Sequence, residues 1–154
     1  MQQHESIEKI NPNCVNTIRI VTLADDNGNI GIFAAFLRLG VVKDSFVDNR
    51  AKGGLGVGIN LETGKLREFG FAHDAFGGKL SAHPLTDVIF KDYQLPYWNE
   101  VKELVINAHK QFYELESIGW DIVITPNGPV ILEGNDDWEI GGPQDTSGGL
   151  KRDG

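Results

Sequence analysis

The chain has 154 residues, of which 40% are hydrophobic and 23% are charged, which is the composition of a globular domain with a core of its own. The formal net charge of −8 argues against binding to nucleic acid or to an anionic membrane surface. Cys14 has no second cysteine with which to form a disulfide, and we find neither a signal-peptide pattern nor an apolar run of membrane-spanning length. We therefore expect a cytoplasmic protein.

The first half of the chain is expected to consist mainly of antiparallel strands. Residues 3–10 are predicted to form a short helix, which Asn11-Pro12-Asn13 ends. Alternating and β-branched segments then predict two hairpins, one from strands 16–23 and 30–39 around the turn Asp26-Asn27-Gly28-Asn29, and one from strands 55–61 and 65–71. Residues 40–54 are predicted to form a loop, and residues 72–95 an irregular segment.

A long helix is predicted from about Pro96 to Ser117. Proline suits a first helical position, and Gly119 suits the end. An apolar stripe at helical spacing is expected to pack on the sheet, with His109 at the surface; its members are Val101, Leu104, Val105, Ala108, Phe112 and Leu115. The fold class is therefore α+β, with a mixed, mostly antiparallel β-sheet and a long helix packed on one face.

The segment from Gly119 to Asn135 predicts a β-hairpin that carries three oxygen ligands. Glu133 and Asn135 are two residues apart, so they share one face of a strand, and Asp121 lies on the partner strand. Two carboxylates and an amide oxygen suit a hard cation such as Mg²⁺. The register depends on a three-residue loop with Gly128 at positive φ, which places Asp121 opposite Glu133. The alternative is a structural hairpin with solvated acidic groups.

Two arginines are candidates for binding phosphate. If Asn27-Gly28 forms a two-residue loop, Thr17 pairs with Arg38 and Arg19 with Phe36, so that both arginines share one face of the sheet. Arginine remains charged and offers a planar fork of donors to phosphate oxygens. The alternative is that both arginines are merely solvated on the exposed face of an antiparallel sheet.

The segment 48–54 is a candidate anion-binding loop. Its backbone N–H groups and its positive side chains suit an anion, although it lacks the Gly-Lys-Ser/Thr pattern of a P-loop. The candidate nucleotide-binding residues in it are Asn49, Gly53 and Gly54. An ordinary glycine-rich turn is the alternative.

Several motifs in one order make the chain resemble a known family. The motifs are Gln3-His4, Ile10-Asn11-Pro12, Val15 to Thr22, Leu37-Arg38-Leu39-Gly40, Val47-Asp48-Asn49, Gly53-Gly54, Pro96-x-Trp98, Gly119-Trp120-Asp121 and Glu133-Gly134-Asn135. Together they resemble the C-terminal lobe of the ATP-grasp fold, most closely that of the sugar-transfer-associated group. The resemblance implies a lobe over residues 1–140, and we expect residues 141–154, rich in Gly, Asp and Ser, to form a flexible tail.

The resemblance also implies a function. ATP-grasp ligases phosphorylate a small-molecule carboxylate with ATP, and an amine or thiol then attacks the acyl-phosphate. Asp121, Glu133 and Asn135 would hold Mg²⁺, Arg19 and Arg38 would neutralise charge on the transferred group, and Asn49, Gly53 and Gly54 would border the reaction centre.

The resemblance covers only the C-terminal lobe and not the N-terminal lobe, whose lysines hold the nucleotide in ATP-grasp enzymes. This difference argues against catalysis by this chain alone. The chain would be an ATP-dependent ligase if that lobe completed it. The alternative is a non-catalytic lobe that forms a homodimer or binds a partner subunit through the surface that the missing lobe would cover.

Overall fold

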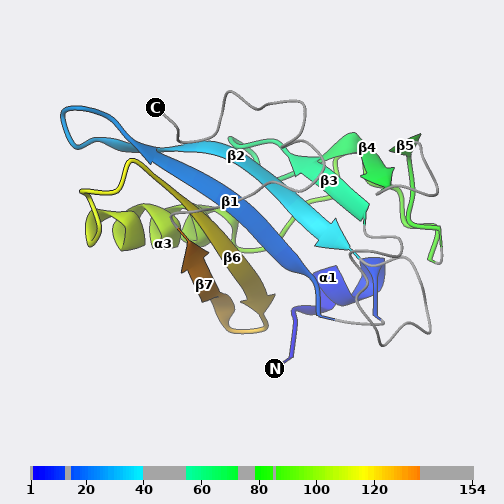
Figure 1. Ribbon diagram of the computed structural model, residues 1–154. Coiled ribbons are helices and arrows are strands. Elements are labelled where there is room, and N and C mark those ends of the chain that lie inside the picture. Colours follow the sequence, from blue (N-terminus) through cyan, green and yellow to red (C-terminus); the bar gives the residue numbers. More distant parts are fainter. Residues whose placement is uncertain (1, 13–14, 40–54, 73–78, 85, 136–154) are drawn as a thin grey trace.

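The computed structural model describes residues 2–12, 15–39, 55–72, 79–84 and 86–135. Its strands form one seven-stranded sheet in the order β5-β4-β3-β2-β1-β6-β7, and each pair of neighbours is antiparallel (Figure 1). The strands are β1 (Thr17–Ala24), β2 (Ile30–Leu39), β3 (Leu55–Ile59), β4 (Leu66–Ala72), β5 (Lys79–Leu80), β6 (Ser117–Thr125) and β7 (Gly128–Asn135). The expected α+β class is confirmed, and the described sheet is wholly antiparallel rather than mixed.

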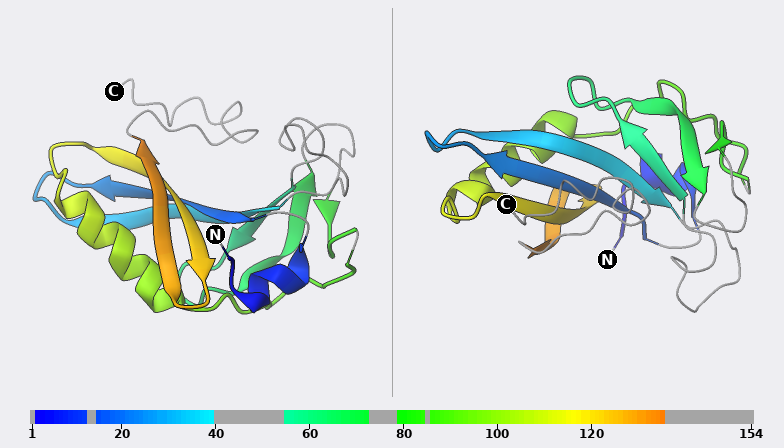
Figure 2. Two further views of the ribbon diagram at one scale, coloured as in Figure 1. Left: turned by 90° about the horizontal axis from the view of Figure 1, so that it is seen from below. Right: turned by 45° about the horizontal axis from the view of Figure 1, so that its top comes forward.

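Two helices lie on the same side of this sheet, as Figure 2 shows: α1 (Glu5–Ile10) and α3 (Trp98–Lys110). We call this side of the sheet the helix face. The core forms between it and the helices, and its fully buried side chains include Ile10, Ile18, Ile20, Leu37, Val57, Val101, Val105 and Ile122. On β1 the buried Ile18 and Ile20 alternate with the partly exposed Arg19, as the period of a strand requires.

The long helix predicted over 96–117 is shorter in the structure. Helix α3 starts at Trp98, after Tyr97 in the left-handed conformation (φ 60°), and its last residue is Lys110. The next residues form tight turns, with N–H groups of Gln111 and Phe112 bonded to carbonyls three residues earlier. This tightening ends the helix early enough for β6 to pair with β1 from Ser117 onward.

The end of the apolar stripe also differs from the prediction. Phe112 is 47% exposed, whereas His109, which we expected at the surface, is fully buried. The buried ring has partners for both nitrogens, the Thr22 hydroxyl at 2.7 Å and the Leu115 carbonyl at 2.8 Å. A histidine can therefore take an inward position that spacing alone would assign to an apolar residue.

Three polar residues of the N-terminal motifs anchor the start of β1. Gln3, Asn11 and Asn16 are all buried. The Asn16 backbone N–H donates to Gln3 Oε1 at 3.0 Å, and the Asn16 amide donates to the Asn11 carbonyl at 2.9 Å. The His4 N–H adds a bond to the Ile124 carbonyl of β6 (2.7 Å). These bonds connect the segment around α1 to the strands that carry Arg19 and Asp121.

The β6–β7 and β1–β2 hairpins both reach the expected pairing at the candidate site, but with loops and bulges that were not predicted. In the β6–β7 hairpin Thr125 pairs with Gly128, so the loop is Pro126-Asn127 and not the three-residue loop predicted, although Gly128 does have positive φ (126°). A β-bulge between Asp121 and Ile122, with Leu132 as the additional residue of β7, then restores the pairing of Asp121 with Glu133.

The β1–β2 hairpin shows the opposite difference. Its loop spans residues 26–28, because the Asp25 N–H bonds to the Asn29 carbonyl, and is one residue longer than predicted. A bulge between Val21 and Thr22 compensates, so the expected pairs Thr17–Arg38 and Arg19–Phe36 are confirmed. The predicted registers therefore hold at the candidate site, while the predicted loops were wrong.

Candidate functional site

The candidate site lies on the side of the sheet opposite the helix face, which we call the arginine face. Directly paired residues of an antiparallel sheet share a face, so one row runs across five strands. The row consists of Gly58 on β3, Phe36 on β2, Arg19 on β1, Asp121 on β6 and Glu133 on β7. Neighbouring strands are about 4.8 Å apart. The fold thus places an aromatic ring, a cation and two carboxylates within reach of one ligand.

Arg19 and Asp121 form a two-point ion pair at the centre of this row. Arg19 Nε donates to Asp121 Oδ1 at 2.6 Å, and Arg19 Nη2 donates to Oδ2 at 3.3 Å. Their side chains are only 14% and 17% exposed, so solvent screens the pair less than it screens a surface salt bridge. Arg38 is a second cation near the same carboxylate, with Nη1 at 3.8 Å from Oδ1. The two predicted arginines are therefore brought together, with a carboxylate between them.

Glu133 and Asn135 are exposed at the end of β7. The Asn135 amide donates to Glu133 Oε2 at 2.9 Å, which places both side chains together on the face that Asp121 shares. Two carboxylates and one amide oxygen are hard donors, so their chemistry fits Mg²⁺. Within the described part of the chain, no cluster of three or more His, Cys, Asp and Glu side chains is placed to hold a metal ion. This donor set would therefore leave several metal positions to ligand oxygens.

The Gly-Trp-Asp and Glu-Gly-Asn motifs fit together residue by residue. Trp120 pairs with Gly134 on the helix face, while Asp121 pairs with Glu133 on the arginine face. A Cβ on Gly134 would lie 2.6 Å from Cζ3 of the Trp120 ring, so only glycine leaves room for the indole. Thr22 Oγ1 accepts the indole N–H at 2.9 Å and fixes the ring. The tryptophan thus sets the position of the β7 segment that carries the candidate metal ligands.

A third arginine on this face was missed by the sequence analysis. The Arg67 Cδ lies 3.2 Å from where a Cβ of Gly58 would stand, so its exposed side chain extends over Gly58 on the arginine face. Gly56 is on the same face opposite Arg38, and its missing side chain leaves space beside the Phe36 ring. Glycines two apart in a predicted strand are a signal that could have indicated this close approach.

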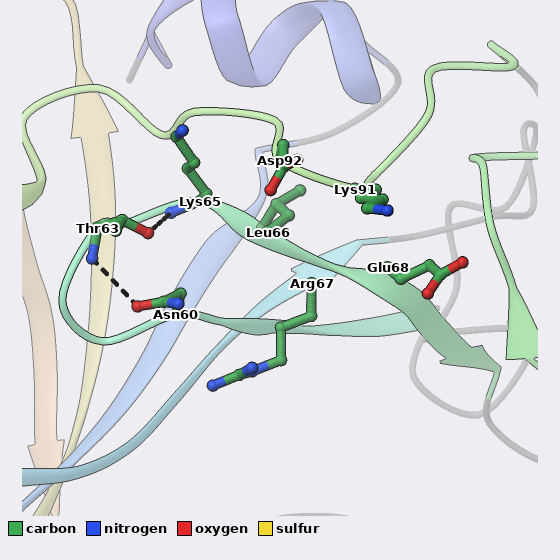
Figure 3. Close-up of a pocket in the computed structure, with 8 residues that line it drawn as sticks. All are labelled: Asn60, Thr63, Lys65, Leu66, Arg67, Glu68, Lys91 and Asp92. Atoms are coloured by element: carbon green, nitrogen blue, oxygen red, sulfur yellow. Dashed lines mark hydrogen bonds between the residues drawn. The ribbon is translucent and has the colours of Figure 1, made fainter.

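A hollow of about 320 Å³ beside the β3–β4 hairpin is a separate feature. Figure 3 shows its lining residues, among them Lys65, Lys91 and Asp92, with Arg67 pointing away from Lys65. Its lining includes no residue of β1, β6 or β7. The hollow therefore does not contain the ion pair or the candidate metal ligands.

Some predicted residues lie outside the described part of the chain. These are the candidate nucleotide-binding residues Asn49, Gly53 and Gly54, and the tail 141–154. Their expected roles stay predictions.

Comparison with known proteins identifies the family. A family model described as sugar-transfer associated ATP-grasp matches residues 1–152. The chain belongs to this family. No curated protein and no solved structure shows significant similarity to this ATP-grasp chain. In the part that the structure describes, no helix combines the length and the apolar character needed to cross a lipid bilayer.

Proposed function

We propose that this ATP-grasp chain uses its arginine face to bind the phosphates of ATP with Mg²⁺, as part of a carboxylate–amine or carboxylate–thiol ligase. The observation that carries the proposal is the row of paired residues in which Arg19 lies between Phe36 and the two carboxylates Asp121 and Glu133. Membership of an ATP-grasp family supports ATP as the nucleotide. The arrangement suits a polyphosphate and a divalent cation bound side by side.

The proposed roles follow from the chemistry of each side chain. Arg19 and Arg38 bind phosphate oxygens, because guanidinium groups stay charged and donate two parallel hydrogen bonds. Asp121, Glu133 and Asn135 supply oxygen ligands to Mg²⁺. When bound, Mg²⁺ neutralises phosphate charge and fixes the positions of the terminal phosphates. Asn49, Gly53 and Gly54 are proposed to border the same site.

The proposed reaction has two steps. A carboxylate oxygen of the small-molecule substrate attacks the γ-phosphorus of ATP, and ADP leaves. An amine or thiol then attacks the acyl-phosphate carbonyl, inorganic phosphate leaves, and the nucleophile loses its proton. Arg19 and Arg38 stabilise the charge that spreads over the transferred phosphoryl group, so the protein need not supply a nucleophile.

Calorimetry with Mg·ATP tests the binding part of this proposal. We expect weak binding to this chain alone, with a dissociation constant on the order of 1 mM, because few contacts must offset the entropic cost of association. The double variant Arg19→Gln/Arg38→Gln should remove this binding. Arg67→Gln is the control for loss of positive charge from the same face, because it leaves both Arg19 and Arg38 in place. Equal Mg·ATP affinity of the double variant and wild type would contradict the proposal.

A second candidate function is association with another copy or with a partner subunit. Among the described residues, strand β7 is an edge of the sheet, and its Val130 and Leu132 are 39% and 49% exposed. Edge strands with apolar side chains readily pair with another chain. The test is the molecular mass in solution for wild type and for Val130→Lys/Leu132→Lys. A monomer in both cases, with no partner-dependent change in mass, would contradict this function.

A further inference from the structure

The carboxylate at the centre of the candidate site is already neutralised by arginine. Both oxygens of Asp121 accept hydrogen bonds from Arg19, at 2.6 and 3.3 Å, and Arg38 lies 3.8 Å from Oδ1. Glu133, directly opposite on β7, instead accepts a bond from the neutral Asn135. The two carboxylates of the proposed metal site therefore have different electrostatic surroundings.

This difference bears on how each ligand can bind by itself. A cation that approaches Asp121 meets two guanidinium groups, which repel it. A phosphate that approaches Arg19 must compete with a carboxylate already bonded to the same donors. The pair is largely shielded from solvent, so that water screens these interactions only in part. Metal alone and polyphosphate alone are both disfavoured by the same contact.

We propose that the Arg19–Asp121 ion pair makes the site selective for the metal–polyphosphate complex over either component alone. When the complex binds, Arg19 would donate its hydrogen bonds to phosphate oxygens instead of to Asp121. Asp121 would then be an oxygen ligand of the metal instead of a partner of Arg19. The exchange gives both members of the ion pair a new partner of opposite charge, whereas a single ligand breaks the ion pair and gives a new partner to only one of its members. This inference rests on the proposed function and adds a role in specificity to the contact between these two residues.

Two titrations without nucleotide test the inference. Mn²⁺ alone is titrated and followed by electron paramagnetic resonance, and inorganic tripolyphosphate is titrated in EDTA by calorimetry. Arg19→Gln should tighten Mn²⁺ binding about tenfold, a coupling of ordinary size between adjacent sites. Asp121→Asn should tighten tripolyphosphate binding by a similar factor. In the double variant Arg19→Gln/Asp121→Asn, neither ligand should bind more tightly than it does to wild type. The carboxylate that would bind Mn²⁺ and the guanidinium group that would bind tripolyphosphate are then both absent.

Matched variants separate this exchange from a general change of charge. Arg67→Gln removes a positive charge from the same face, and it should change Mn²⁺ affinity by less than about twofold, because solvent screens an exposed side chain. Glu133→Gln removes the carboxylate next to Asp121, and it should not tighten tripolyphosphate as Asp121→Asn does. Arg19→Lys keeps the charge but cannot make two parallel bonds, so its Mn²⁺ affinity should lie between those of wild type and Arg19→Gln. It also serves as the second variant if Arg19→Gln unfolds.

The outcomes are distinct from those of the Mg·ATP titration. If Mn²⁺ binds no more tightly to Arg19→Gln or Arg19→Lys than to wild type, the inference is overturned. The same holds if Asp121→Asn fails to tighten tripolyphosphate, or if Glu133→Gln tightens it equally. Absence of Mg·ATP binding to wild type would overturn the proposed function, whereas the titrations with the separate ions would still report on the ion pair.

Discussion

The two faces of the sheet use polar residues in opposite ways, and β1 carries an example of each. On the helix face, Thr22 is fully buried and lies between the His109 ring and the Trp120 indole. On the arginine face, Arg19 is bonded to Asp121, and a ligand can compete for either partner. Burial stabilises the first arrangement, because each polar group would lose its hydrogen bonds without forming new ones to water. Partial exposure makes the second arrangement exchangeable.

The hydrogen-bond directions on the helix face follow from the chemistry of the partners. The Leu115 carbonyl can only accept, so His109 Nε2 carries a proton and donates to it, and Nδ1 of the ring shares a hydrogen bond with the Thr22 hydroxyl. The same hydroxyl oxygen accepts the Trp120 indole N–H. Both ring nitrogens of His109, the Thr22 hydroxyl and the Trp120 indole N–H are thus hydrogen-bonded, which is the condition for a stable buried network.

The first prediction compares two neighbours on β1. Ile20→Ala should lower the free energy of unfolding by about 3 kcal/mol, because it replaces most of a fully buried side chain with a cavity. Arg19→Gln should lower it by only about 1 kcal/mol, because glutamine can still donate a hydrogen bond to Asp121 and Arg38 lies 3.8 Å from the same carboxylate. Urea denaturation of both variants gives the comparison. If Arg19→Gln costs as much stability as Ile20→Ala, then the ion pair is part of the core and the contrast between the faces is wrong.

The second prediction concerns the buried network. Thr22→Val keeps the shape of the side chain but removes the hydroxyl, which leaves His109 Nδ1 and Trp120 Nε1 without their partner. We expect a loss of about 2 kcal/mol of stability, the cost of unsatisfied buried polar groups. Thr22→Ser, which keeps the hydroxyl, should be the milder change by chemical denaturation. The opposite ranking would mean that the methyl group, and not the hydrogen bonds, matters here.

The arrangement of the site was predictable to the extent that strand alternation determines it. Alternation placed Glu133 and Asn135 on one face of their strand whichever turn precedes them. Arg19 and Arg38 lie on different strands, so they share a face only in the register that was predicted and that the pairing of β1 with β2 confirms. The lengths of the turns were not predictable from Asn-Gly and Pro-Asn-Gly. Loops of two and of three residues can both lead to the same register, because a bulge adds one residue to a strand and compensates for the difference. Such bulges depend on the pairing with other strands, which local sequence does not encode.

Contacts between distant segments could not be predicted from the sequence either. The Arg19–Asp121 ion pair joins residues 102 positions apart, and it forms because β6 pairs with β1 in the centre of the sheet. The spacing of Glu133 and Asn135 does not indicate that order of strands. Likewise, the need for glycine at position 134 becomes evident only once Trp120 lies across from it.

The third prediction tests whether the two faces are connected through β7. Gly134→Ala would place a methyl group 2.6 Å from the Trp120 ring, which its bond to Thr22 holds. Overpacking of this kind costs about 1–3 kcal/mol, so the melting temperature should fall by several degrees. Because β7 must shift, Mn²⁺ binding should also weaken in this variant. The control is Gly31→Ala, where an added methyl group meets no atom within 4 Å, so both properties should stay as in wild type. Loss of stability in Gly134→Ala with unchanged metal affinity would mean that the faces are independent.

The last prediction has the smallest effect on stability and isolates the arginine face. Glu133→Gln should leave the melting temperature within about 2 °C of wild type, because the side chain is exposed and its loss creates no cavity. It should nevertheless weaken Mn²⁺ binding strongly, since it removes one of two anionic ligands.

Two further substitutions rank the proposed ligands. Asn135→Ala should act in the same direction as Glu133→Gln but less strongly, because the amide is a neutral ligand. Asp121→Asn should resemble Glu133→Gln when Mn²⁺ is titrated together with tripolyphosphate, because Arg19 can then bind phosphate and Asp121 can serve the metal. The measurement is Mn²⁺ affinity with and without tripolyphosphate, alongside a melting curve for each variant. Wild-type Mn²⁺ affinity in Glu133→Gln under both conditions would show that the β6–β7 hairpin is structural, and the arginine face would then differ from the helix face only in its exposure.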